Sequence, residues 1–497
     1  MASAQPRIPI ALPEPLPAAG EGVARFGLPL LSVALLGALG MALFTDQPLI
    51  AIAIPAVALG AIACVRRPVA AILTVFVLSG LINTVAAFTP IPPNPLVDYV
   101  LLGLWVGVAG IYLSGGSPRV FWLWPALLAP LLYLVVTLFG VLLVDPFSDG
   151  FDAFRAAAWY MAAMVLVAVA PLSREMHLQI ARGIAVVGLI IGLYLFYRWQ
   201  VGPSGSENLA AAAAQPQRAL QQRFFGSFLS PFQLAQWTAT LIPFLLALGL
   251  AWRGKWRLIA FAGIALLATA LLASDVRTAV ISVAAGLIVV LAMYLAAPAF
   301  PGRLAIGMAT LLGVVVFAAA GYALTVGSSD VRTERYARIL NPTEDEAYTD
   351  RLLTWEIALD EMAEEPWGHG LGTAGGAAEK TEAGIEFGAV ASEHLDSSYI
   401  KVGLEQGFAV MLLFAAGMIG LLVGMGARAL RIHDPERAAL VIGGAGALAA
   451  LIPLFYAGLY SEGMPVVAAW LLVGLGVAQA TLRPASERGL AGRQVEA

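Results

Sequence analysis

Apolar runs of membrane-crossing length recur along almost the whole sequence and constrain its fold more than any other feature. A transmembrane helix needs about 20 mostly apolar residues, and we count fourteen such runs between short polar gaps. Only 12% of the residues are charged and the mean hydropathy is +0.84, whereas soluble domains carry roughly a quarter charged residues. We therefore expect an all-α polytopic membrane protein. The runs are 26–44, 48–64, 69–88, 97–113, 121–144, 156–171, 183–200, 232–251, 257–273, 279–297, 304–325, 404–427, 438–460 and 464–482.

These runs divide the chain into five expected segments. Residues 1–25 are rich in proline and lack the basic region, apolar stretch and cleavage site of a signal peptide, so we expect a disordered cytoplasmic tail. Residues 26–325 hold the first eleven helices, 326–403 form a long polar loop, and 404–482 hold the last three helices. Residues 483–497 are expected to form a second cytoplasmic tail. We expect 12 to 14 membrane helices, because one or two weak runs can be re-entrant.

The distribution of Lys and Arg predicts the orientation in the membrane. Short cytoplasmic loops retain these residues, and with the N-terminus inside, one set of loops holds most of them, including Arg66, Arg67, Arg253, Arg428 and Arg431. The sequence thus predicts cytoplasmic termini and places loop 326–403 outside, in the periplasm of a bacterium. The single cysteine, Cys64, excludes intramolecular disulfides and Cys-x-x-Cys redox chemistry.

The long loop is strongly acidic. Between residues 328 and 407 we count 17 acidic and 6 basic residues, a net charge of −11. The loop also carries helix signals: Thr349 and Asp350 are candidate N-caps, apolar residues follow at helical spacing, and Pro366 is a stop signal. We expect a folded helical cap lying on the periplasmic face.

Several ionisable residues are expected on that same face. Arg218 and Arg223 lie between the seventh and eighth spans, and Arg277 opens the tenth. An ionisable group at the edge of a span is costly and is a functional hypothesis by default, although Arg277 could equally snorkel to lipid headgroups or pair with Asp275. Arg218 is expected to be an interfacial anchor.

Two of the four histidines fall on the periplasmic side. His394 precedes the point where the loop re-enters the membrane, and in a helix it would share one face with Ser398 and Lys401. His369 lies in Gly368–Gly372, where three glycines indicate a tight turn. Taken alone, a single histidine is more often structural than catalytic.

The order of these motifs carries a resemblance to a known family. Arg223-Phe-Phe-Gly-Ser-Phe, Arg277, Arg351-x-x-x-Trp355 with Pro366-Trp-Gly-His-Gly-Leu-Gly, and His394 before Glu405-Gln-Gly occur in the order found in the O-antigen ligase and polymerase superfamily. The chain resembles these bacterial inner-membrane glycosyltransferases over roughly residues 215 to 425. It departs from them at Ser230-Pro-Phe, where Asn-Pro-Asn is common, at the separation of Ser274 from Arg277, and at Leu395, where an Asn often follows the histidine.

The resemblance implies a chemistry that these residues permit. Such enzymes transfer a glycan from undecaprenyl diphosphate to an acceptor hydroxyl, with a fold like that of C-type glycosyltransferases and no cofactor. Arginine forks suit a departing diphosphate, which assigns Arg223, Arg277 and then Arg351 to the donor. Histidine titrates near neutrality and suits a general base, which assigns that role to His394. Arg218 and His369 are assisting candidates.

The resemblance also implies partners. They are the lipid-linked glycan donor, a glycan or lipid A core acceptor, membrane lipids, and chain-length regulator and flippase proteins; no nucleic acid is expected. The acidic loop would repel an anionic lipid A core, which tilts the interpretation from ligase towards polymerase of O-antigen, capsule or exopolysaccharide.

Two alternative interpretations, a metal-dependent mechanism and a flippase, remain open. A metal-dependent mechanism could use the loop carboxylates, but no acidic constellation accompanies Arg277, so no metal site is predicted. A lipid-glycan flippase would also suit many spans, yet transporters usually place polar groups at the bilayer midplane and show repeat symmetry. Here the span centres are nearly free of charge.

Overall fold

The computed structural model describes most of the chain as helices. The described residues are 48–88, 93–113, 125–144, 147–214, 223–300, 346–374, 397–456, 458 and 464–481. Within these ranges every regular element is a helix, which confirms the expected all-α polytopic class. The apolar runs 26–44 and 304–325 and both expected tails lie outside the described residues.

The helix bounds follow the apolar runs closely. The α-helices are α2 (Pro48–Arg66), α3 (Pro68–Gly80), α4 (Ile82–Phe88), α5 (Pro93–Leu113), α6 (Leu128–Gly140), α7 (Phe147–Ala157), α8 (Ala162–Val169), α9 (Arg174–Val201), α10 (Gly205–Ala214), α11 (Pro231–Ala251), α12 (Lys255–Ala273), α13 (Arg277–Ala296), α16 (Glu346–Glu364), α18 (Ser398–Gln406), α19 (Phe408–Ala429), α20 (Pro435–Tyr456) and α21 (Val466–Thr481). Three 3₁₀ turns, η1 (Pro125–Leu127), η2 (Val141–Leu143) and η3 (Trp159–Met161), extend α6 and precede α8.

Eight helices in the described part are long and apolar enough to cross a membrane. Two further apolar stretches are bent pairs: α3 and α4 meet at 79°, and the helices on either side of residue 158 meet at 52°. Counting each bent pair as one span gives up to ten. Two shorter apolar helices, Ala53–Arg66 and Val466–Thr481, correspond to the expected runs 48–64 and 464–482.

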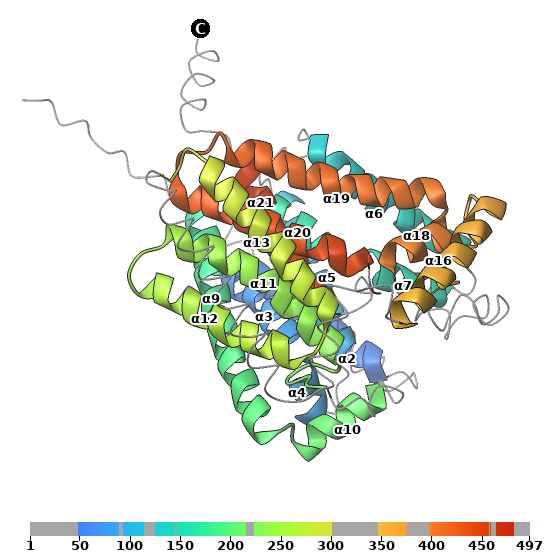
Figure 1. Cartoon of the computed structure of the whole chain (residues 1–497), viewed down its shortest axis with the longest axis horizontal. Coiled ribbons are helices and arrows are strands. Elements are labelled where there is room, and N and C mark those ends of the chain that lie inside the picture. The colour runs from blue at the N-terminus through green and yellow to red at the C-terminus, as the bar shows by residue number, and fades with distance from the viewer. Residues whose placement is uncertain are drawn as a thin grey trace, which may run out of the picture.

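Helices α11 and α20 form the centre of the molecule. Their apolar windows are 94% and 89% buried, whereas the other candidate spans bury less than half of theirs. In Figure 1 the two helices lie within the bundle, with α13, α19 and α12 outside them. Close packing at the centre depends on glycine: a Cβ at Gly286 of α13 would stand 2.7 Å from both the Gly446 carbonyl oxygen and the Pro243 ring. The backbones of α13 and α20 are therefore in close contact at this point, where the Pro243 ring of α11 also packs.

Short connections and glycine contacts show which helix ends share one face. Three residues join α11 to α12 and three join α12 to α13, so α11 and α13 begin on the same face. A Cβ at Gly443 would meet Phe244 and one at Gly446 would meet Pro243, so α20 runs antiparallel to α11 and ends on that face. Gly286 is the tenth residue of α13, and Pro243 the thirteenth of α11. At about 1.5 Å of rise per residue, the first residue of α13 lies about 14 Å from the contact between Gly286 and Pro243, and the first residue of α11 lies about 18 Å from it, along the helix axes. The last residue of α20 lies about 15 Å from Gly446. We call the face formed by these three ends the site face.

A network of ion pairs joins helix starts on the opposite face. Arg174 at the start of α9 pairs with Asp434 at 2.5 Å and with Glu436 at 3.6 Å, and Arg182 pairs with Glu436 at 3.7 Å and with Glu175 at 3.5 Å. These pairs tie the first turns of α9 and α20 together. The ends of α9 and α20 therefore emerge on the site face.

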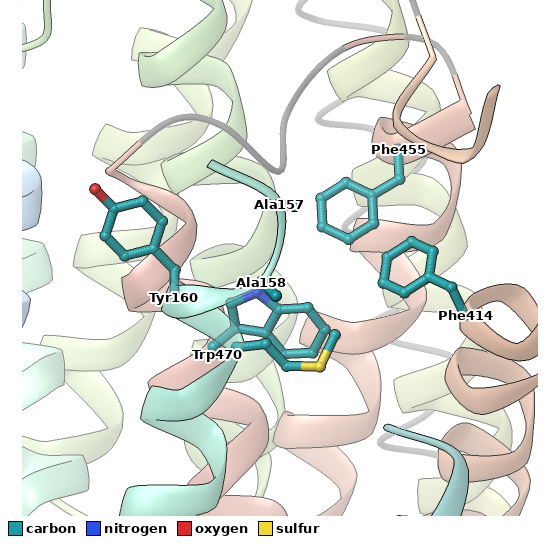
Figure 2. A pocket seen from close by; sticks show the side chains of 7 residues that line it. Ala157, Ala158, Tyr160, Phe414, Phe455 and Trp470 are labelled. Atoms are coloured by element: carbon teal, nitrogen blue, oxygen red, sulfur yellow. The ribbon is translucent and has the colours of Figure 1, made fainter. Parts of the chain in front are cut away.

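A small cavity beside the second helix bend is an apolar packing gap. Its lining is Ala157, Ala158, Tyr160, Met161, Phe414, Phe455 and Trp470. Figure 2 shows the rings of Phe414 and Phe455 beside one another, while the Tyr160 hydroxyl points away from them. The two rings are stacked with centroids 5.9 Å apart. This lining offers no charged group to a glycan or a phosphate.

Candidate functional site

The sequence-predicted residues come from separate elements of the site face. Arg223 lies in the turn before α11, Arg277 is the first residue of α13, Arg351 is in α16, and His369 follows α16. His394 and Arg218 lie outside the described residues. The helix ends thus bring Arg223 and Arg277 to one level of the bundle.

Arg223 opens a turn that docks onto the bend between α3 and α4. The Ser227 hydroxyl donates to the Gly80 carbonyl at 2.6 Å, and the Asn83 amide donates to the Ser227 carbonyl at 2.8 Å. A bend inside an apolar segment frees backbone groups that need partners, and Ser227 supplies two. Arg223 itself lies over the Phe232 ring, 5.9 Å from its centroid, in a cation–π contact. The turn therefore fixes both the arginine and the bend.

Arg277 lies at a helix N-terminus, where a positive charge is unfavourable. It is the first residue of α13, and the N-terminal end of a helix carries partial positive charge. The preceding turn is also strained, because Asp275 adopts φ +56°, a region costly for a residue other than glycine. Departures from local preference are expected at functional sites. The guanidinium and the helix end together favour an anion.

Arg351 lies on a helix that packs against α18. Trp355, Ala358 and Met362 of α16 form one apolar cluster with Ile400 and Leu404. The Trp355 ring also meets Tyr456 edge to face, at 4.6 Å between centroids. In Figure 1, α16 and α18 lie side by side at one end of the molecule. The helix begins at Glu346, so Thr349 and Asp350 lie inside it, and their expected capping role is wrong.

The glycine-rich loop after α16 is clamped onto the end of α18. The His369 and Gly370 amides donate to the Leu404 and Glu405 carbonyls at 2.8 and 2.9 Å. A Cβ at Gly368 would stand 2.5 Å from the Gly407 nitrogen, and both glycines have positive φ. The glycines therefore permit a backbone approach that no other residue allows.

A buried ion pair anchors this clamp. Lys401 and Glu405 are one helical turn apart in α18, their charged groups are 3.2 Å apart, and their side chains are 1% and 0% exposed. The same Glu405 oxygen accepts from the Gly372 amide at 3.0 Å and the Ala374 amide at 3.4 Å. Both charges belong to the acidic segment 328–407, and the fold buries them.

His369 is oriented by two elements. Its Nε2 lies 3.5 Å from a carboxylate oxygen of Glu361 in α16, and the imidazole is 12% exposed. Its backbone is fixed to α18 by the clamp. The side chain is therefore held close to a carboxylate at the site face, as an assisting acid or base would need to be.

Of the helical face expected for His394, Ser398 and Lys401, the described residues include only Ser398 and Lys401, which lie in α18. The helix α18 begins at Ser398, and Ser397 precedes it in an extended conformation with φ −154° and ψ 123°. The Ser397 hydroxyl accepts from the Ile400 amide and so caps the helix.

Sequence reasoning missed Glu207, a fully buried carboxylate at the site face. It accepts hydrogen bonds from Tyr194, from the Ser204 amide at 2.9 Å and hydroxyl at 2.8 Å, and pairs with Arg198 at 2.9 Å. The Glu207 amide donates back to the Ser204 hydroxyl at 3.3 Å. Ser204-x-x-Glu207 is thus a capping box, a sequence signal that could have located the start of α10.

Stability should fall in acid because of Glu207. Burial raises the pKa of this carboxyl, but the hydrogen bonds from Tyr194 and Ser204 and the charge of Arg198 outweigh it and lower the pKa below the ordinary value. The stabilisation is therefore present above the unfolded carboxyl pKa of about 4.3 and is lost as the pH falls through the lower folded pKa. We expect Glu207→Gln to show a smaller drop in melting temperature than the wild type between pH 7 and pH 3, measured by thermal unfolding in detergent. Equal drops would contradict this role.

The described residues show no group of three or more His, Cys, Asp or Glu side chains placed to hold a metal ion. The polar groups of the site face include arginines, a lysine–glutamate pair and a histidine–glutamate pair, which lie on separate elements. Such a face can bind an anion and hold a proton-transferring group. It matches a transferase whose leaving group is anionic.

Comparison with known families supports this class. Residues 262–415 match the family model described as O-antigen ligase. The matched range contains Arg277, Arg351, His369 and His394 and begins after Arg218 and Arg223. No curated protein shows significant similarity to the chain.

The chain is thus a multi-pass membrane protein by its apolar helices, and its residues 262–415 are similar to the O-antigen ligase family. The match supports an enzyme of the glycosyltransferase type.

Proposed function

We propose that the protein is a bacterial inner-membrane glycosyltransferase that uses an undecaprenyl-diphosphate-linked glycan on the periplasmic face. The observation that carries the proposal is Arg277 at the N-terminal end of α13, inside the matched family range and level with the Arg223 turn. A guanidinium beside a positive helix end favours a diphosphate. The helix end is in place before a ligand arrives, as electrostatic stabilisation of a leaving group requires.

In the proposed reaction the acceptor hydroxyl oxygen attacks the anomeric carbon of the donor sugar. The bond from that carbon to the diphosphate oxygen breaks, and the lipid diphosphate leaves with the electron pair. Arg223, Arg277 and Arg351 stabilise its negative charge, and His394 accepts the hydroxyl proton. The position of His394 three residues before the cap of α18 supports its delivery to the site face.

A polymerase is the form we favour. The segment 328–407 carries a net charge of −11, which disfavours an anionic lipid A core and favours a neutral or weakly charged glycan acceptor. A ligase that uses lipid A core is the second candidate, because the matched family model is described as O-antigen ligase.

The two forms differ in what they need as acceptor. Purified protein is supplied with undecaprenyl-diphosphate glycan, with and without lipid A core, and the products are separated on a gel. We expect a ladder from the donor alone. A single shifted band that requires lipid A core would establish the ligase instead, and no transfer by well-folded protein would favour a flippase.

A further inference from the structure

A cluster of polar side chains surrounds the buried Glu207 carboxylate. If this position only packed helices together, an apolar side chain could serve there. The residues of the cluster are Glu207, Ser204, Tyr194 and Arg198. The Arg198 guanidinium provides the opposite charge and also donates to the Tyr194 hydroxyl at 3.0 Å. Burying a carboxylate is costly unless it is fully hydrogen-bonded, and this one is bonded by three different elements: α9, the Ser204 turn and α4.

The contact with α4 links this cluster to the bend. The Asn83 side-chain amide donates to the Glu207 carbonyl at 3.3 Å, and the Thr84 hydroxyl lies 3.5 Å from its carboxylate. Figure 1 shows α10 lying against α4, away from the centre of the bundle. Glu207 therefore holds α10 and the second half of the bent pair together.

The same bend receives the Arg223 turn. Asn83 donates through its side chain to Glu207 and through its backbone to Ser227, four residues after Arg223. Upstream of Arg223, the chain leaves α10, whose first turn contains Glu207. Glu207 thus holds Asn83 through its backbone carbonyl and Thr84 through its carboxylate, and Asn83 in turn holds the segment that follows Arg223.

We propose that Glu207 is a positioning residue that holds Arg223 ready for the diphosphate of the lipid-linked donor. The inference rests on the proposed function, because it takes Arg223 as a donor ligand. The carboxylate fixes the position of residue 207, whose backbone carbonyl holds Asn83, and Asn83 in turn binds Ser227 after Arg223. Arg198 balances the charge of the carboxylate within the cluster. Losing this chain of contacts weakens donor binding and leaves acceptor binding intact.

The test compares wild type, Glu207→Gln, Arg223→Ala and the double variant. Binding of undecaprenyl diphosphate and the KM for donor and for acceptor are measured on each purified protein. Small misplacements of a binding group cost up to about a hundredfold, so we expect Glu207→Gln to weaken donor binding about tenfold to a hundredfold at unchanged acceptor KM. The double variant should bind no more weakly than Arg223→Ala, because coupled residues are not additive.

Glu175→Gln is the matched control, since Glu175 also pairs with an arginine but on the opposite face; its donor KM should be that of wild type. If Glu207→Gln does not fold, Tyr194→Phe removes one hydrogen bond to the same carboxylate and takes its place in the double-mutant comparison with Arg223→Ala.

Additive losses, or equal losses for donor and acceptor, would refute the positioning role. A wild-type protein that neither binds undecaprenyl diphosphate nor transfers glycan would overturn the proposed function and this inference with it. Binding by wild type that the substitution leaves unchanged would overturn the inference alone.

Discussion

His394→Ala is expected to abolish glycan transfer while the protein still folds and binds its donor. A positioned general base typically contributes about 10²–10⁴-fold to a rate, and the proposed reaction needs a group to accept the acceptor's proton. The measurement is the initial rate of product formation with saturating undecaprenyl-diphosphate glycan. Donor affinity should stay close to that of wild type, because the diphosphate is assigned to the arginines.

His433→Ala provides the comparison for this variant. His433 is exposed in the turn before α20, on the opposite face, so its removal should leave the rate unchanged. A His394→Ala enzyme with the wild-type rate would remove the histidine from the mechanism. Loss of donor affinity without loss of maximal rate would instead assign it to binding.

The apolar runs predicted most of the described helices, because burial in lipid acts on local composition. The run 232–251 corresponds to α11, Pro231–Ala251, and 257–273 to α12, Lys255–Ala273. The bend between α3 and α4 was not predicted, since it depends on Ser227, 147 residues away from its partner Gly80. A break of this kind leaves no signal within the run 69–88.

The candidate site was only partly predictable, for a similar reason. Arg277 was found because a charge beside an apolar run is a local anomaly. Glu207 was missed because its importance comes from Tyr194, Arg198 and Thr84, which only the folded chain brings to it. Lys401 and Glu405 were counted among the charges of the acidic segment 328–407, and only packing against α16 and the glycine loop reveals that they are buried.

Lys401→Met should strongly destabilise the clamp between α18 and the glycine loop. Removing one partner of a buried ion pair typically costs about 3–5 kcal/mol, because the other charge stays in a poorly solvating environment. Here the remaining charge would be the Glu405 carboxylate, which is 0% exposed. We expect a clearly lower apparent melting temperature in detergent and faster proteolysis within the clamped loop.

The double variant Lys401→Met/Glu405→Gln separates the charge from the packing. A glutamine at 405 keeps an oxygen for the Gly372 and Ala374 amides but carries no charge, so the double variant should recover most of the stability lost by Lys401→Met. Glu175→Gln, which removes an exposed partner of Arg182, should change the stability by less than about 1 kcal/mol.

If Lys401→Met melts at the wild-type temperature, the pair does not stabilise the clamp. If the double variant melts no higher than Lys401→Met, the loss comes from the packing of the lysine chain, and the clamp would then depend on the fit of α18 against α16 and not on its buried charges.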